Sequence, residues 1–178
     1  MGGRNQAGAR RPVGNHATGL PVQTQSIANW WPVPLRLIVG YGFFAHGTAK
    51  LARGPDAFVA ILTALGVPYP HLMAWLTIDF ELLCGLLVLC GAFITLASIP
   101  MAVILLVAMV TVHLQNGFSS IKLIAVTPAG AQFGPPGVET DLLYLACLVP
   151  LVLGGSGPFA FDSFRRRRRG KQSASEFS

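Results

Sequence analysis

Two carboxylates interrupt a long apolar segment of the chain. Asp79 and Glu81 lie within residues 73–90, where nearly every other side chain is apolar. An ionisable side chain at membrane depth costs roughly 2.5–3.5 kcal/mol on insertion scales, so such residues normally have a partner or a function. Carboxylates and histidines exchange protons near neutral pH when their surroundings favour it. The two carboxylates therefore indicate a site that handles protons inside a membrane.

Composition supports the membrane setting. The chain has 178 residues, of which 52% are hydrophobic and only 11% charged, with a mean hydropathy of +0.56. Soluble domains carry about 25% charged residues. Residues 72–114 are almost continuously apolar. As one helix they would be about 65 Å long, twice the roughly 30 Å of a hydrocarbon core, so they must fold back near Gly91.

The chain is therefore predicted to be an all-α integral membrane four-helix bundle. Residues 56–65 are too short to span and have apolar side chains at helical spacing, which favours a short interfacial helix between spans one and two. The predicted domains are a disordered tail over 1–28, a four-span membrane domain over 29–162 and a disordered basic tail over 163–178. The four spans are expected at about 34–51, 72–90, 93–114 and 138–153, with Pro100 as a kink in the third.

The distribution of basic residues predicts the orientation. The two tails hold nine of the thirteen Lys and Arg residues. Basic residues near span ends favour the cytoplasm, so both termini are predicted to be cytoplasmic. Arg165–Arg169 is expected to contact anionic lipid head groups rather than nucleic acid. The three cysteines form no CxxC pair, which argues against a disulfide framework and against a zinc site.

Ionisable residues from all four predicted spans fall in one layer. With both termini inside, Asp79 and Glu81 lie about 9 and 12 Å below the outer surface, and His46 lies about 8 Å below it. The others in this layer are Lys50, His113, Glu139 and Asp141. One interpretation is a pocket for protons or quinone that opens to the outside. The alternative is structural, with paired charges that hold the helices together at about 1 kcal/mol each.

The two carboxylates cannot both face the centre of the bundle. They are two positions apart and so about 200° apart around a helix. Glu81 shares its face with Cys84 and Gly85, and small residues allow close helix packing. Glu81 is therefore predicted to meet Lys50 or His46, with His113 as the further alternative. Asp79 is expected to turn toward the same face of span one or toward the interfacial helix. No EXXH or HXXE spacing occurs among these residues, so no metal is expected.

Several short motifs together resemble the DoxX/DoxD-like family of small bacterial membrane proteins. They occur in order within residues 35–162: Arg-Leu-Ile-Val-Gly at 36–40, Phe-Phe-Ala-His-Gly-Thr-Ala-Lys-Leu at 43–51, Leu-Gly-Val-Pro at 65–68, Glu-Leu-Leu-Cys-Gly-Leu-Leu at 81–87, His113 with Gly117-Phe118, Gly-Val-Glu at 137–139, and Gly154, Gly157 and Asp162. One departure is the ending Gly-Ser-Gly-Pro-Phe-Ala-Phe-Asp, where the family often has Gly-Pro-Gly-x-x-Ser before a hydrophobic residue and Asp.

The resemblance implies a multi-pass protein of the bacterial inner (plasma) membrane and a role beside redox enzymes. Some members look like subunits of a thiosulfate:quinone oxidoreductase, and others join complexes that resist oxidative stress. No cysteine arrangement here would hold a thiosulfate-derived persulfide. The predicted function is a membrane subunit of a quinone-linked oxidoreductase system. The alternatives are a non-catalytic adaptor that recruits soluble redox enzymes and a small membrane transporter.

Each candidate residue has a predicted role in that function. Glu81 and His46 are the candidate catalytic residues, expected to exchange protons with a quinone. The candidate cofactor-binding residues are Lys50, Trp75, Asp79, His113 and Glu139.

Overall fold

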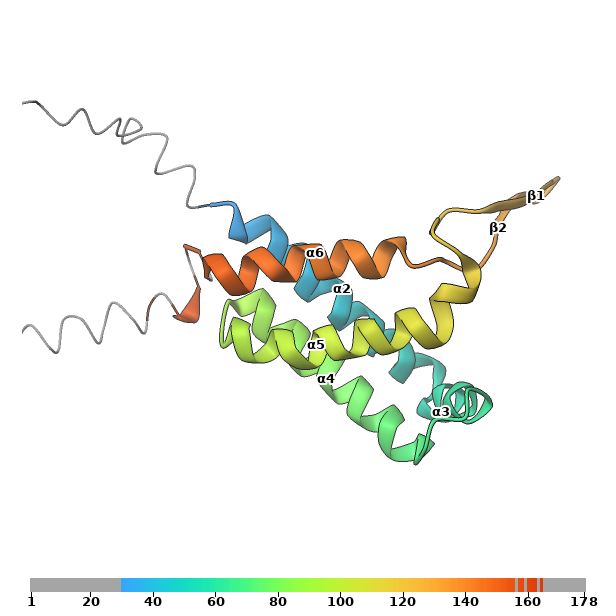
Figure 1. Ribbon diagram of the computed structural model, residues 1–178, viewed down its shortest axis with the longest axis horizontal. Coiled ribbons are helices and arrows are strands. Elements are labelled where there is room, and N and C mark those ends of the chain that lie inside the picture. Colours follow the sequence, from blue (N-terminus) through green and yellow to red (C-terminus); the bar gives the residue numbers. More distant parts are fainter. Residues whose placement is uncertain (1–29, 156, 159, 163, 165–178) are drawn as a thin grey trace, which may run out of the picture.

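The computed structural model describes residues 30–155, 157–158, 160–162 and 164, and these residues are mostly helical (Figure 1). The elements are α2 (Pro32–Arg53), α3 (Pro55–Ala64), α4 (Pro70–Cys90), α5 (Ile94–Ala108), the π-helix η1 (Met109–His113), the 3₁₀-helix η2 (Leu114–Asn116), β1 (Leu123–Thr127), β2 (Gly130–Phe133) and α6 (Glu139–Gly154). The predicted tail over 1–28 and Arg165–Arg169 lie outside the described residues, and Phe164 is the one described residue of the predicted tail over 163–178.

Proline and glycine residues mark the helix ends. Proline stands in the first turn of α2, α3 and α4, where its missing N–H leaves no hydrogen bond unmade. Gly91 ends α4 with φ of 67°, a left-handed conformation that glycine adopts without strain. Phe93 then begins α5 with φ of 50°. The predicted fold-back near Gly91 is confirmed.

Four long helices lie alongside one another. Helix α2 packs against α4 and α6, and α5 packs against α4 and α6. The start of α2, the α4–α5 turn and the end of α6 lie at one end of the molecule (Figure 1). The backbone N–H of Asp162 donates to the carbonyl of Gly91 at 3.3 Å, which joins the segment after α6 to that turn. Helix α3 lies across the other end of the molecule.

Glycines let α2 and α4 approach closely. A Cβ on Gly40 would lie 2.8 Å from the carbonyl oxygen of Gly85, and a Cβ on Gly85 would lie 2.7 Å from the backbone nitrogen of Phe44. No larger side chain fits at either position without moving a helix. The buried core beside this contact consists of Val39, Phe43, Cys84, Val88, Ile94, Ala97, Met101, Leu105, Leu148 and Leu151.

The all-α prediction is wrong in one segment. Strands β1 and β2 form an antiparallel hairpin within residues 115–137, the segment between predicted spans three and four. A half-buried strand is identified by alternating apolar and polar residues. That alternation is absent here because neither strand lies on the core, and all four residues of β2 are exposed. The hairpin projects beyond the helices at the same end as α3 (Figure 1).

Among the described residues, two helices are long and apolar enough to cross a membrane: Pro70–Cys90, and the continuous stretch Ile94–Asn116 formed by α5, η1 and η2. These ranges agree with predicted spans two and three to within two residues, and Pro100 lies inside α5 as expected. Helix α2 covers the first predicted span and α6 the fourth. The arrangement as four membrane spans, and the cytoplasmic placement of the termini, remain predictions.

Candidate functional site

An ion pair joins α2 to α4. The Nζ atom of Lys50 donates to both carboxylate oxygens of Glu81 at 2.5 Å. The Glu81 side chain is only 5% exposed and that of Lys50 is 23% exposed. The ammonium also lies 4.9 Å from the centre of the Phe58 ring on α3, within the range of a cation–π contact. The predicted meeting of Glu81 with Lys50 is therefore confirmed, and α3 covers the pair.

Gly47 makes room for this pair. A Cβ at Gly47 would lie 2.9 Å from the side chain of Leu82 and 3.2 Å from Cβ of Glu81. The absence of a side chain brings the backbone of α2 against α4 one turn before Lys50. The short distance between the helices is what lets the Lys50 side chain reach a carboxylate that is otherwise enclosed.

A second ion pair joins the end of the third helix to α6. The Nδ1 atom of His113 lies 2.6 Å from Oδ2 of Asp141, with side-chain exposures of 23% and 5%. An ionised carboxylate can only accept, so Nδ1 of His113 donates and Nε2 is left for another partner. His113 ends the π-helix η1, and single-turn π segments inserted in α-helices frequently occur at functional sites.

Both pairs line one cavity of about 1180 Å³. Its walls come from α2, α3, α4, α5 and the start of α6, and most of the lining side chains are apolar. The polar side chains that line it include His46, Lys50, Arg53, Glu81, His113 and Asp141. The cavity therefore combines a few polar groups with a largely apolar wall, which is the usual composition of a small-molecule site.

His46 differs from the paired residues around it. Its side chain is exposed, lines the cavity and makes no hydrogen bond to another described residue. Its imidazole is thus available to a ligand in the cavity. The aromatic wall nearby consists of Phe43 and Tyr144, whose rings meet edge to face with centroids 5.8 Å apart.

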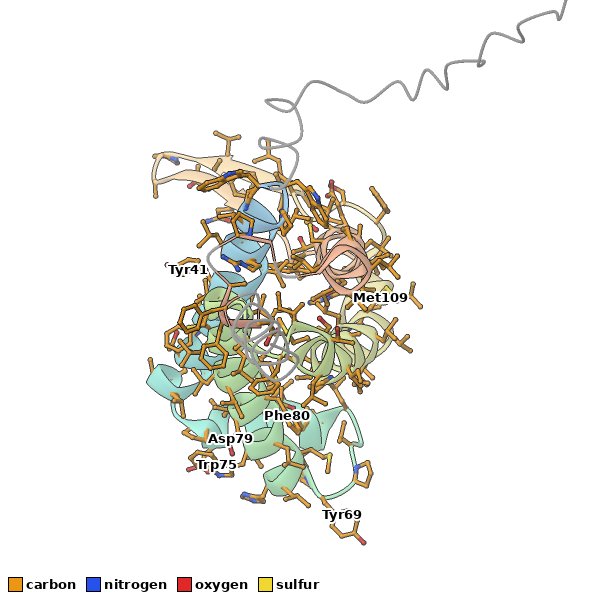
Figure 2. All side chains as sticks on the ribbon, turned by 90° about the vertical axis from the view of Figure 1, so that its left-hand side faces the viewer. Tyr41, Tyr69, Trp75, Asp79, Phe80 and Met109 are labelled. Atoms are coloured by element: carbon orange, nitrogen blue, oxygen red, sulfur yellow. The ribbon has the colours of Figure 1, made fainter. Side chains whose placement is uncertain are left out.

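Three of the candidate residues do not line the cavity. Trp75 and Asp79 are exposed on α4, because they lie on the opposite side of that helix from the lining residues Thr77, Phe80 and Cys84. Figure 2 shows Trp75 and Asp79 on the same side of the molecule, away from Met109 at the start of η1. Within the described chain Asp79 forms no ion pair.

Glu139 is the third residue that the cavity does not include. One of its carboxylate oxygens accepts a hydrogen bond of 2.8 Å from the backbone N–H of Ser120. The hydroxyl of Thr140 lies 2.8 Å from that of Ser120. These contacts hold the loop after η2 against the start of α6, so Glu139 has a structural partner here.

Asp141 is the functional candidate that the sequence did not single out. The sequence predicts Asp141 and Glu139 in the same layer, but nothing in the sequence says which of the two faces inward. The structure places Asp141 inside, 4% exposed, and leaves Glu139 at the loop. The two residues are about 200° apart around the helix, so only one can face the bundle. The period of the buried residues in α6, Asp141, Leu148 and Leu151, is the signal that identifies the inner face.

The arrangement is suited to proton exchange with a ligand. Two buried carboxylates are each held by a basic side chain, and a third basic residue, His46, faces the same cavity. Among the described residues, no group of three His, Cys, Asp or Glu side chains is placed to hold a metal ion.

Comparison with known proteins supports the family resemblance. Residues 32–114 match the family model described as DoxX, a range that includes His46, Lys50, Glu81 and His113. A protein of Bacillus subtilis (strain 168) named "Putative oxidoreductase CatD" is 29% identical over 142 residues, which cover 79% of this chain and 92% of that protein.

A second relative, the "Uncharacterized membrane protein Rv3486" of Mycobacterium tuberculosis (strain ATCC 25618 / H37Rv), is 29% identical over 158 residues, covering 78% of this chain and 90% of that protein. No solved structure matches the chain. The family model matched over residues 32–114 and these two relatives support a DoxX-like protein, and the name of the second relative, together with the two apolar helices, indicates a membrane location.

Proposed function

We propose that this chain is a multi-pass subunit of a quinone-linked oxidoreductase in the bacterial inner membrane. The observation that carries the proposal is that two ion pairs, whose residues come from four different helices, line one largely apolar cavity. The relative named as an oxidoreductase supports redox chemistry. A quinone is an apolar molecule with two polar oxygens, so its chemistry fits such a wall.

The proposal places four spans in the bilayer. At 1.5 Å per residue, the 22 residues of α2 extend about 33 Å and the 16 residues of α6 about 24 Å. The first length matches a hydrocarbon core of about 30 Å, and the second spans most of it. With basic tails inside, α3, the hairpin and both ion pairs lie toward the outer surface. This orientation follows from the charge distribution and is a part of the proposal.

The residues of the cavity would orient a quinone and supply its protons. A bound quinone would accept two electrons from a redox partner protein and two protons. Glu81, His46 and Nε2 of His113 line the cavity and are groups that can exchange a proton with a bound ligand. Lys50 holds the carboxylate of Glu81 in place, and Asp141 does the same for the imidazole of His113. The apolar wall keeps bulk water from the two carboxylates, Glu81 and Asp141, which are each 4% exposed.

The test is quinone-dependent electron transfer in membranes from cells that produce each variant at normal protein level. Glu81→Gln and His46→Gln are expected to lower the rate, and His46→Gln is the cleaner test because it breaks no hydrogen bond or ion pair between described residues. His71→Gln, an exposed histidine outside the cavity, is the control. If Glu81→Gln is present, folded and as active as wild type, the proton-exchange role is wrong.

A second candidate function is an adaptor that recruits a soluble redox enzyme. The hairpin favours it, because Ile124 and Val126 on β1 and Phe133 on β2 are 60–75% exposed on an element that projects beyond the helices. Exposed apolar patches on projecting elements often mark protein contacts. Ile124→Ser with Val126→Ser should then abolish co-purification of a redox enzyme while leaving the cavity chemistry intact. Unchanged co-purification would remove the support for an adaptor role of the hairpin.

A further inference from the structure

The cavity is open along one side, between α4 and α5. Large apolar side chains that line it are more than half exposed on both helices: Leu83 on α4 is 56% exposed, and Leu96 and Val103 on α5 are 67% and 54% exposed. If another part of the described chain covered these side chains, they would be buried. Their exposure therefore shows that no described segment closes this side. The carboxylates at the polar part of the cavity are by contrast about 4% exposed. The cavity is therefore a groove with an enclosed polar part and an open apolar part.

In the proposed arrangement of four spans, the open side faces the bilayer rather than water. It is formed by Pro70–Cys90 and Ile94–Asn116, which within the described chain are the helices long and apolar enough to cross a membrane. The groove follows α5 from Leu96 to Ala108, which is about 18 Å of helix. The core between the helices is filled, since Val39, Met101 and Leu151 are fully buried there. The cavity also extends beneath α3, but the α4–α5 groove is the part that runs along α5 away from α3. A long molecule bound in the polar part can extend along this groove.

We infer that the ligand of this site is an amphiphile that enters sideways from the bilayer and keeps a long apolar tail in the groove between Leu83, Leu87, Leu96, Ile99 and Val103. The inference rests on the proposed quinone function and deepens it, because it assigns the ligand to the membrane-dissolved quinones with isoprenoid tails. The tail-binding residues decide which ligand fits, and the ionisable residues act on its head group.

Whether a residue lines the groove should decide how strongly its substitution affects ligand binding. Leu83→Trp and Val103→Trp place a large ring in the groove. Leu86 on α4 and Leu106 on α5 are also apolar and are 49% and 46% exposed, but neither lines the cavity. Leu86→Trp and Leu106→Trp are thus matched controls: they make a similar change, on the same helices, at a similar exposure, one turn away from the groove residues at positions that do not line the cavity.

The experiment measures binding of two probes to each purified variant in lipid nanodiscs. One probe is a naphthoquinone with a long isoprenoid tail, and the other is the same ring with a methyl group in place of the tail. Both groove variants should weaken binding of the tailed probe by roughly tenfold or more, as overpacking of a filled site does. The same variants should change binding of the methyl-substituted ring less than about twofold, because its site beside His46 and His113 is untouched. The control variants should bind both probes as wild type does.

The other outcomes separate the inference from the proposed function. If groove and control variants bind the tailed probe equally well, or the groove variants weaken both probes alike, the tail does not lie between α4 and α5 and the inference is wrong. If the tailed probe is unaffected while a phospholipid acyl chain is found in the groove, the groove is a lipid site, which also overturns it. If wild-type protein binds neither probe, the quinone function itself fails, and the inference fails with it.

Discussion

The ammonium of Lys50 and the carboxylate of Glu81 form an ion pair between α2 and α4, at a point where Gly47 brings the two helices into contact. The carboxylate is almost fully enclosed, while the lysine retains some exposure to the cavity. This pair is therefore both a bond between two helices and a wall of the candidate site. The two roles make different predictions when one partner is removed.

The pair should show strong coupling in stability. Removing one partner of a buried ion pair leaves an uncompensated charge, which costs roughly 3–5 kcal/mol. Glu81→Gln and Lys50→Met should each lower the free energy of unfolding in detergent, and the double variant should lose less than the sum of the two. Thermal or denaturant unfolding of the three variants measures this. Strict additivity would show that the two side chains do not interact.

The other carboxylate of α4 should behave in the opposite way. Asp79 is exposed and has no ion-pair partner within the described chain. Substitutions at exposed positions away from such contacts usually change stability by less than about 0.5 kcal/mol. Asp79→Leu should thus leave unfolding in detergent unchanged. A loss as large as that of Glu81→Gln would mean that Asp79 has a partner in a second molecule, which size measurement of the purified protein would reveal.

The contrast between these two residues marks what the sequence could predict. Helical periodicity alone separated the faces of Asp79 and Glu81, and small neighbours identified Glu81 as the enclosed one. The fold-back at Gly91 followed from the length of the apolar segment. The first feature depends only on local helical periodicity, and the second depends only on comparing the segment's length with the thickness of a hydrocarbon core. The sequence alone is therefore enough to derive both.

Contacts between distant segments were predicted only in part. Lys50 and Glu81 are 31 positions apart, and His113 and Asp141 are 28 apart. The first pair was predicted because Lys50 and His46 share one face of span one near the predicted depth of Glu81. The second was missed because Glu139 and Asp141 are equivalent in the sequence until the rotation of α6 is known. The hairpin was missed because its strands have no buried face to produce alternation.

The contact between His113 and Asp141 should fix the imidazole. A hydrogen bond to a charged group contributes about 1.5–3 kcal/mol. Asp141→Asn should lower the free energy of unfolding by an amount in this range. It should also make quinone binding less sensitive to His113→Gln: the loss of affinity caused by His113→Gln should be smaller in the Asp141→Asn background, because the imidazole is no longer held there. Glu139→Gln is the control, since its amide oxygen can still accept from Ser120. Equal losses in the two variants would contradict a special role for Asp141.

Close packing of α2 on α4 should make Gly85 intolerant of any side chain. A Cβ there would meet the backbone of Phe44 at 2.7 Å and the carbonyl oxygen of Gly40 at 2.8 Å. Forcing added atoms into such a contact typically costs about 1–3 kcal/mol. Gly85→Ala should lower the unfolding temperature in detergent and lengthen the Lys50–Glu81 distance. Ala146→Leu, at an exposed position of α6, should have little effect. A fully stable Gly85→Ala protein would show that the two helices can separate without loss.

The last prediction concerns the orientation of the protein in the membrane. The proposed position of the site near the outer surface depends on this orientation. The start of α2, the α4–α5 turn and the end of α6 share one end of the molecule, with α3 and the hairpin at the other (Figure 1). If the basic tails keep the first end inside, topology reporters fused after Leu51 and at Ala129 should read outside, and those at Gly91 and Ser178 should read inside. Lysine substitutions that replace Arg165–Arg169 should keep the orientation, whereas glutamine substitutions should weaken it. A C-terminus that reads outside would contradict either the four spans or their direction, and would place His46, Glu81 and His113 toward the cytoplasm.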